Sequence, residues 1–244
     1  MATVWLDGPA RRNALGHAAW AALPSIMADA ASKSRAIILR GRGGNFGAGA
    51  DIKEFEEVFA TRDTALAYFD RMEAAMRAVE AVDVPVIAAI DGLCVGASVA
   101  LALACDFRVA SATSSYAITP AKLGIAYPYG DVRRVVSAIG PSRTKALMFS
   151  GRSIPAALAL TYGLVDIVEA DLETGIAEFA GIVTSCSPWT IRATKKAVAA
   201  IGAGLGPAEA GYPGILAEAV AGADFAEGMA AFAARRRPDF KTIV

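Results

Sequence analysis

Two glycine-rich turns, each between a predicted strand and a predicted helix, are the parts of this sequence best suited to chemistry. The first runs from Gly41 to Glu54 and the second from Asp91 to Gly96. A helix start carries backbone N–H groups without partners, and these groups attract developing negative charge. Two such starts that face one another would direct two amide donors at one carbonyl oxygen, which is the geometry of an oxyanion hole.

The details of the turns favour this chemistry over phosphate binding. Counted from Gly41, the third glycine of a dinucleotide fingerprint would fall on Phe46, so the spacing fails. Asp51 and Glu54 stand at the spacing of a capping box, which predicts a helix start after Asp51. Residues 96–98 are all small, so a ligand can approach the backbone of the second turn closely.

Other kinds of catalytic site are not indicated. His17 is the single histidine of the chain, so a nucleophilic triad has no second histidine to activate a serine or cysteine. The cysteines Cys94, Cys105 and Cys186 form no CxxC pair, and we predict core thiols with neither a disulfide framework nor a metal site.

Composition and charge exclude several partners. The 244 residues include 24 basic and 24 acidic ones, so we expect no nucleic-acid partner. The longest apolar segments, Val84–Ile90 and Ala97–Cys105, are shorter than the ~20 residues that cross a bilayer, and we expect no membrane association. The first residues do not resemble a signal peptide, and we predict a cytoplasmic protein.

Apolar runs and alanine-rich helical stretches alternate through most of the chain, which is typical of an α/β fold with a parallel sheet. The predicted strands are Ala36–Arg40, Val84–Ile90, Phe107–Ala110 and Leu164–Val168, and the predicted helices are 14–30, 64–81, 95–104 and 155–162. Leu66, Phe69, Met72, Met76 and Val79 form the predicted core face of the helix over 64–81. Both glycine-rich turns then lie at the carboxyl edge of the sheet, where open α/β folds bind ligands.

The last quarter of the chain is predicted to be helical. Helical segments are expected over 172–185, 188–201, 208–220 and 225–236. We place the boundary at Ser187–Pro188, which gives an α/β core over 1–187 and a helical region over 188–244.

The order and spacing of several motifs resemble those of the crotonase (enoyl-CoA hydratase/isomerase) superfamily. These motifs are Asn13–Leu15, Phe46–Lys53, Ala88–Gly92 with Gly96, Cys105–Phe107, Thr119–Gly124, Gly151–Arg152, Gly163–Val165, Glu227–Met229 and Arg235–Phe240. The resemblance covers nearly the whole chain. It implies a ββα spiral core, a C-terminal helical region used in trimer formation, and a homo-trimer or hexamer.

The same resemblance implies a site for an acyl-CoA thioester and its enolate. Ala50 and Ala97 correspond to the residues whose backbone N–H groups form the oxyanion hole. Coenzyme A is part of the substrate, so no separate cofactor is expected. The predicted substrate contacts are Arg12, Asp51, Ile52, Lys53, Gly96, Phe240 and Lys241. Of these, Phe240 and Lys241 correspond to a tail that can reach the ligand of a neighbouring subunit.

The chain departs from the family at the two glutamates that hydratases use. Ala100 and Pro120 stand at those positions, whereas hydration needs one group to activate water and another to protonate carbon. Nearby candidates for catalysis are Tyr127 and Asp131. Asp131 precedes a helical stretch and is also a candidate N-cap.

Three functions therefore stay open. The first is an enoyl-CoA hydratase or isomerase in which Asp131, or an acid from the segment 54–73, carries the proton. The second is an acyl-CoA decarboxylase or hydrolase with Tyr127 as proton donor, because the run Ile118–Tyr127 resembles that of methylmalonyl-CoA decarboxylases. The third is a binding protein that kept the thioester pocket without catalysis.

Overall fold

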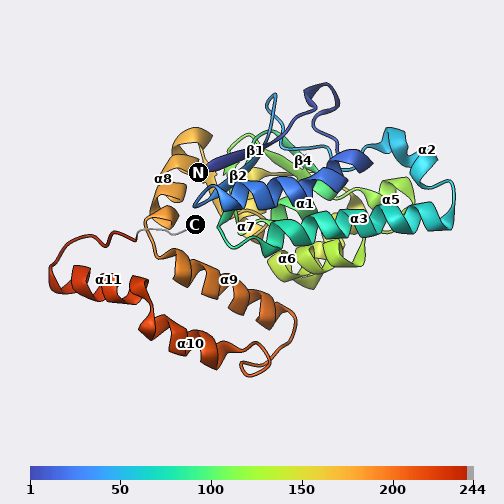
Figure 1. Cartoon of the computed structure of the whole chain (residues 1–244). Helices are drawn as coiled ribbons and strands as arrows, with labels where there is room; N and C mark the ends of the chain where they lie inside the picture. Colours follow the sequence, from blue (N-terminus) through green and yellow to red (C-terminus); the bar gives the residue numbers. More distant parts are fainter. Residues whose placement is uncertain (241–244) are drawn as a thin grey trace.

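The protein is an α/β structure built on a five-stranded parallel sheet; the computed structural model describes residues 1–240 (Figure 1). The strand order is β1 (Ala2–Leu6), β2 (Ile37–Gly41), β3 (Val86–Ile90), β5 (Phe107–Ser111) and β8 (Ile167–Glu169). A smaller sheet contains β4 (Leu93–Val95), β6 (Ser115–Ala117) and β7 (Ile154–Pro155). The expected α/β class with a parallel sheet is confirmed.

Helices cover both faces of the main sheet. The helices of the body are α1 (His17–Ser32), α3 (Arg62–Ala81), α4 (Ala97–Ala104), α6 (Tyr129–Ser150), α7 (Ala156–Tyr162) and α8 (Leu172–Thr184). Short turns of helix are η1 (Pro9–Arg11), η2 (Ile52–Glu54), α2 (Phe55–Val58) and α5 (Pro120–Leu123). The C-terminal helices are α9 (Pro188–Gly202), α10 (Tyr212–Ala221) and α11 (Ala223–Ala233).

The alternation of side chains along β2 and β3 divides the core into two layers. Ile37 and Leu39 join the large cluster beneath α1, α3 and α4. Ile38 and Ile87 point to the other face, where Leu172 and other apolar residues of α8 cover them. Because both faces are buried, the two strands are nearly continuous apolar runs, which is why the sequence reveals them.

Two details of the helices differ from the prediction. In α3, Leu66 is 49% exposed whereas Tyr68 is 2% exposed, so the helix turns Tyr68 and not Leu66 toward the core. A helical stretch was expected after Asp131, but the full length of α6 was not predicted. Gly140 has φ 76° and ψ 165°, and Pro141 follows it, so the helix is kinked and its periodicity is interrupted.

The C-terminal helices α9 to α11 extend from the body as an arm (Figure 1). The arm begins at Pro188, and Lys195 on α9 ties it to the core through Asp106, with Nζ and Oδ2 2.6 Å apart. The division into units at Ser187–Pro188 stays a prediction. Cys94 and Cys105 are buried thiols as expected, but Cys186 is exposed beside this junction, so its assignment to the core was wrong.

No helix within residues 1–240 is both long enough and apolar enough to cross a membrane.

Candidate active site

The two glycine-rich turns lie side by side at the carboxyl ends of β2 and β3. The amide of Phe46 donates to the carbonyl of Asp91 (2.8 Å), and Gly47 exchanges backbone hydrogen bonds with Leu93 and Val95 (both 2.9 Å). Gly47 and Cys94 therefore form a parallel bridge between the turns. The predicted meeting of the two turns at one edge of the sheet is confirmed.

Close approach of the two backbones requires a glycine at position 49. A Cβ atom on Gly49 would lie 2.7 Å from the carbonyl oxygen of Val95 and 3.0 Å from the amide nitrogen of Ala97. The φ angle of Gly49 is also +91°, which L side chains rarely adopt. Only glycine fits at position 49, because the chain around Ala50 packs directly against the start of α4.

The amides of Ala50 and Ala97 are left free, whereas those of Gly49, Asp51 and Gly96 beside them are bonded. Gly49 donates to Oγ of Ser98 (2.9 Å), and Asp51 donates to the carbonyl of Leu15 (3.0 Å). Gly96 donates to the carbonyl of Ala117 (2.9 Å). Among residues 1–240, the N–H groups of Ala50 and Ala97 have no partner. The site thus offers two unpaired donors on adjoining turns.

The carbonyl group of each of these two peptide units is, in contrast, hydrogen-bonded. The carbonyl of Gly49, which shares a peptide unit with the amide of Ala50, accepts from the amide of Leu15 at 2.8 Å. The carbonyl of Gly96, which shares a peptide unit with the amide of Ala97, accepts from the Tyr127 hydroxyl at 2.8 Å. Both peptide planes are therefore held from the side opposite the free N–H.

A small apolar cavity of about 70 Å³ adjoins the two amides. Of the residues predicted to be functional, Ala50, Ile52, Gly96, Ala97 and Tyr127 line it. The remaining lining residues, most of them apolar, are Ala48, Phe55, Phe59, Tyr68, Phe69, Met72, Thr119, Pro120, Leu123, Ile125, Ala126 and Pro128. Such a lining suits a short hydrocarbon group next to two polar donors.

Tyr127 turns its ring to the cavity and its hydroxyl to the start of α4. The hydroxyl donates to the Gly96 carbonyl, so its proton is engaged in a hydrogen bond within the protein. Burial raises the pKa of Tyr127 well above its usual value, and the nearby carboxyl of Asp131 raises it further. Tyr127 is therefore a neutral hydrogen-bond donor at physiological pH.

Asp131 lies in the first turn of α6, not at its N-cap, which is Pro128, so the N-cap prediction was wrong. Its side chain is 2% exposed; one oxygen lies 3.1 Å from the guanidinium of Arg134, and Oδ2 has no partner among the described residues. Burial raises the pKa of Asp131 to about 7; Arg134 opposes the rise, and Glu73 and Glu80 add to it. Asp131 is not among the residues that line the cavity.

Of the predicted coenzyme A contacts, Asp51 and Lys53 lie at the end of the first turn and Arg12 lies just after η1. Asp51 is buried, accepts a hydrogen bond from the amide of Lys53 (3.2 Å) and pairs with Arg11. Arg12 and Lys53 are exposed, and the carbonyl of Arg12 accepts from the amide of Ala48 (2.9 Å). The Arg12 side chain and Lys53 are thus available to a ligand outside the cavity.

The capping box predicted from Asp51 and Glu54 is not formed. Asp51 caps the short helix η2, but the carboxylate of Glu54 accepts from the amide of His17 (2.6 Å) at the start of α1. Glu54 therefore caps the start of α1 instead of completing a capping box at η2.

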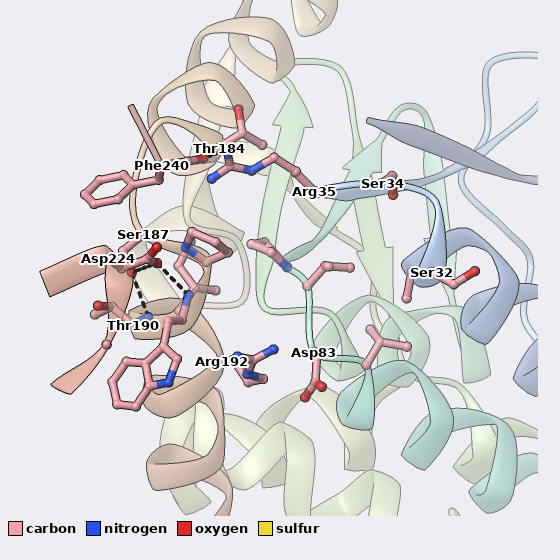
Figure 2. Close-up of a pocket in the computed structure, with 18 of the residues that line it drawn as sticks. Ser32, Ser34, Arg35, Asp83, Thr184, Ser187, Thr190, Arg192, Asp224 and Phe240 are labelled. Atoms are coloured by element: carbon pink, nitrogen blue, oxygen red, sulfur yellow. Dashed lines mark hydrogen bonds between the residues drawn. The ribbon is translucent and has the colours of Figure 1, made fainter. Parts of the chain in front are cut away.

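Phe240 is not among the residues that line the small cavity beside the two amides. Phe240 lines a larger cavity of about 980 Å³ between the body and the arm, and its carbonyl accepts from Arg35 (3.0 Å). Figure 2 shows one paired polar group of this cavity, Asp224, which accepts from both Ser187 (2.6 Å) and the amide of Trp189 (3.3 Å). Lys241, also predicted to contact substrate, lies outside the described residues.

Sequence reasoning missed three residues that position the site. Ser98 connects α4 to Gly49, Tyr68 forms part of the cavity wall, and Asn13 donates to the carbonyls of Arg42 (2.8 Å) and Asn45 (2.7 Å) in the first turn. A buried polar residue is normally hydrogen-bonded, so Ser98 within an otherwise apolar helix start was a signal that could have been used.

The comparisons with known proteins agree with this geometry. The family model described as "Enoyl-CoA hydratase/isomerase" matches residues 1–242. The chain is 32% identical to the 2,3-dehydroadipyl-CoA hydratase of Escherichia coli (strain K12), over 97% of this chain and 93% of that protein.

Solved structures give the same result for the fold. An enoyl-CoA hydratase/isomerase family protein from Hyphomonas neptunium has a TM-score of 0.93 and 38% identity, covering 98% of this chain and 93% of that one. An enoyl-CoA hydratase from Bacillus anthracis has a TM-score of 0.89 and 31% identity, covering 98% and 94%. The fold is that of the crotonase superfamily.

The chain belongs to the enoyl-CoA hydratase/isomerase family, whose members act on acyl-CoA thioesters. The prediction of an enzyme of the hydratase/isomerase type is confirmed at that level.

Proposed function

We propose that this enzyme binds a short acyl-CoA thioester, polarises its carbonyl with the amides of Ala50 and Ala97, and stabilises the enolate that forms. The observation that carries this proposal is the pair of unpartnered N–H groups on adjoining turns, both at one cavity. Donors aimed at the oxygen where charge develops contribute about 100- to 1000-fold each to the rate of acyl chemistry.

The cavity supports a short acyl group. Its volume of about 70 Å³ and its aromatic wall leave room for a few carbon atoms beside the thioester. We place the coenzyme A moiety outside the cavity, past Ile52, which is 58% exposed at its mouth. Arg12 and Lys53 are then the cations for its phosphates, and Asp51 orders the turn between them.

The hydratase/isomerase reaction is our first candidate. The positions that correspond to the two glutamates of hydratases hold Ala100, which is fully buried in α4, and Pro120, which lines the cavity. We propose that Asp131 is the proton reservoir in their place. Its burial favours the neutral acid and its Oδ2 has no partner among the described residues; because Asp131 does not line the cavity, the proton would pass to the substrate through an intervening group.

Decarboxylation of a malonyl-type thioester is a second candidate. Within the described residues, the side-chain hydroxyls that line the cavity come from Tyr68, Thr119 and Tyr127, and no carboxylate lines it. Loss of carbon dioxide leaves the electron pair on the α-carbon, so it produces the same enolate without a base. The two amides would stabilise that enolate, and a proton delivered to the α-carbon would complete the reaction.

We propose that the enzyme assembles as a homo-trimer or hexamer through the arm and works in the cytoplasm without a separate cofactor. Supporting the assembly, apolar side chains are exposed along α9–α11: Val198, Ile201, Leu216, Val220, Phe225, Met229 and Phe232. Exposed apolar surface of this kind is typical of an interface.

A binding and turnover comparison tests the function. The full chain is titrated with acetyl-CoA, crotonyl-CoA and free coenzyme A, and then assayed with crotonyl-, 3-enoyl- and malonyl-type thioesters. We expect acyl-CoA to bind more tightly than coenzyme A and one thioester class to be turned over. Binding without turnover of any class would support a non-catalytic acyl-CoA-binding protein, and no binding at millimolar concentration would refute the proposal.

A further inference from the structure

We propose that Tyr127 is a positioning residue of the oxyanion hole, acting on the substrate carbonyl through the Gly96–Ala97 peptide unit. Its hydroxyl donates to the carbonyl of Gly96, and the N–H of the same peptide unit is the free donor of Ala97. The inference rests on the proposed function, because it requires that this N–H meets the thioester oxygen. It assigns to Tyr127 the control of a main-chain donor, in place of proton donation.

The geometry of the peptide bond couples the two groups. In a trans peptide unit the C=O and N–H point in opposite directions within one plane, so a donor that holds the carbonyl also aims the amide. The Gly96 carbonyl receives two donors, the Tyr127 hydroxyl at 2.8 Å and the amide of Val99 at 2.9 Å. Hydrogen bonds in such a chain polarise one another by roughly 10–30% per bond, which makes the Ala97 N–H a stronger donor.

The amide of Val99 is the main-chain group that holds this carbonyl, and the residue on the N-terminal side of the peptide unit is a glycine. Gly96 has φ 57° and ψ −127°, a conformation that glycine adopts readily and other residues avoid. Glycine also gives the peptide unit after it the freedom to rotate. The Tyr127 hydroxyl reaches this peptide from the segment between α5 and α6, and Pro128 follows it immediately. The Tyr127 hydrogen bond thus adds to that of the Val99 amide in restraining rotation of the Gly96–Ala97 peptide plane.

The peptide unit that carries the amide of Ala50 differs, because its carbonyl is held by the main chain alone. The Gly49 carbonyl, opposite the N–H of Ala50, is held by the main-chain amide of Leu15 at 2.8 Å. No side-chain substitution removes that amide, short of proline. Of the carbonyls of Gly49 and Gly96, only that of Gly96 accepts a hydrogen bond from a side chain within the described residues. A substitution of Tyr127 can therefore change how strongly the oxyanion hole binds the thioester oxygen.

The test measures the substrate carbonyl directly. Acetyl-CoA labelled with carbon-13 at the thioester carbonyl is bound to the full-length enzyme, and the carbonyl stretching frequency is read by isotope-edited infrared spectroscopy. We expect a shift to lower frequency on binding to the wild type and a clearly smaller shift with Tyr127→Phe. For the reaction that the enzyme catalyses, kcat should fall about tenfold with KM nearly unchanged, less than the about 100-fold loss from removing a donor.

A second variant and a control separate positioning from packing. Replacing Tyr127 with 3-fluorotyrosine keeps the ring and makes the hydroxyl a stronger donor, so the shift should exceed that of the wild type. Tyr129→Phe changes a hydroxyl two residues away on a side chain that is 86% exposed, and it should leave the shift unchanged. Melting temperatures of all variants report on folding.

The outcomes distinguish this inference from the function on which it rests. If the carbonyl frequency shift is the same in the wild type, in Tyr127→Phe and in the fluorinated variant, the positioning role of Tyr127 is wrong. The oxyanion hole is then still supported. Acetyl-CoA that binds the wild type with its free frequency unchanged would refute the oxyanion hole itself, and the role of Tyr127 with it.

Discussion

The hydroxyl of Ser98, at the start of α4, accepts a hydrogen bond from the amide of Gly49 at 2.9 Å. This bond joins the helix that carries Ala97 to the turn that carries Ala50, so the Ser98 side chain adds to the backbone bridge at Gly47 in fixing the separation of the two free amides. The Ser98 side chain is fully buried, so the bond is shielded from bulk solvent.

We therefore expect Ser98→Ala to damage both stability and the site. The Gly49 amide would lose its acceptor while buried, which costs about 1–3 kcal/mol of the free energy of unfolding. Urea denaturation and acyl-CoA titration measure the two effects. Ser150→Ala removes an exposed hydroxyl that bonds within α6, and it should change neither quantity. Equal behaviour of the two variants would show that the Ser98 bond does not order the turns.

Substitution of Ala97 by proline should remove one donor with little change of fold. Ala97 is the first residue of α4, a position where proline is well tolerated because the N–H has no helical partner. We expect kcat/KM to fall by about 100-fold or more. Ala223→Pro is the matched control, because it also alters the first residue of a helix that follows a glycine. A fully active and folded Ala97→Pro enzyme would exclude this amide from catalysis.

The titration of Asp131 predicts a pH-dependent stability. Its pKa is raised from 3.8 to about 7, so the folded state binds the proton more tightly than the unfolded state. This contribution to stability is complete below the unfolded pKa and is lost as the pH rises through about 7. Asp131→Asn keeps an oxygen for Arg134 but does not titrate, so the wild type should lose stability relative to it between pH 4 and 7.

Urea denaturation of both proteins at half-unit pH steps measures this difference. The groups that face Asp131 are Arg134, Glu73, Glu80 and the hydroxyl-bearing Tyr127. If the difference in free energy of unfolding between the two proteins does not change with pH over this range, the carboxyl of Asp131 is not held in its neutral form.

Phe69 should limit the length of the acyl group. Its ring lies 5.4 Å from that of Phe59 between centroids, and both rings line the cavity. Phe69→Ala should extend the cavity and lower KM for longer acyl chains relative to short ones. Leu66→Ala on the same helix is the control, because Leu66 is exposed and does not line the cavity. An unchanged chain-length preference would place the acyl group elsewhere.

The location of the site could be predicted because backbone features carry it. Buried strands β2 and β3 are visible as apolar runs, and the glycines that follow them mark turns whichever side chains surround them. Ala50 and Ala97 could be predicted as the donors because the family resemblance places them in those turns. The alternation of strands and helices indicated a parallel sheet, whereas strand register and sheet order were not predicted.

The partners of the side chains could not be predicted in the same way. The bond from Tyr127 to Gly96 spans 31 residues and comes from a segment without regular structure, so no periodicity reveals it. Glu54 stood at the right spacing for one cap and serves another helix, because His17 lies closer in space. Asp131 read as a helix cap, yet burial beside Arg134 gives it a different environment.

Both electrophilic contacts of the proposed hole are peptide hydrogens, which neither gain nor lose a proton at any pH where the protein is folded. Their attraction for the thioester oxygen is therefore constant across that range. Any acid or alkaline limb in the rate profile must come from the groups that move protons, so the profile isolates those groups without interference from the pair that holds the charge.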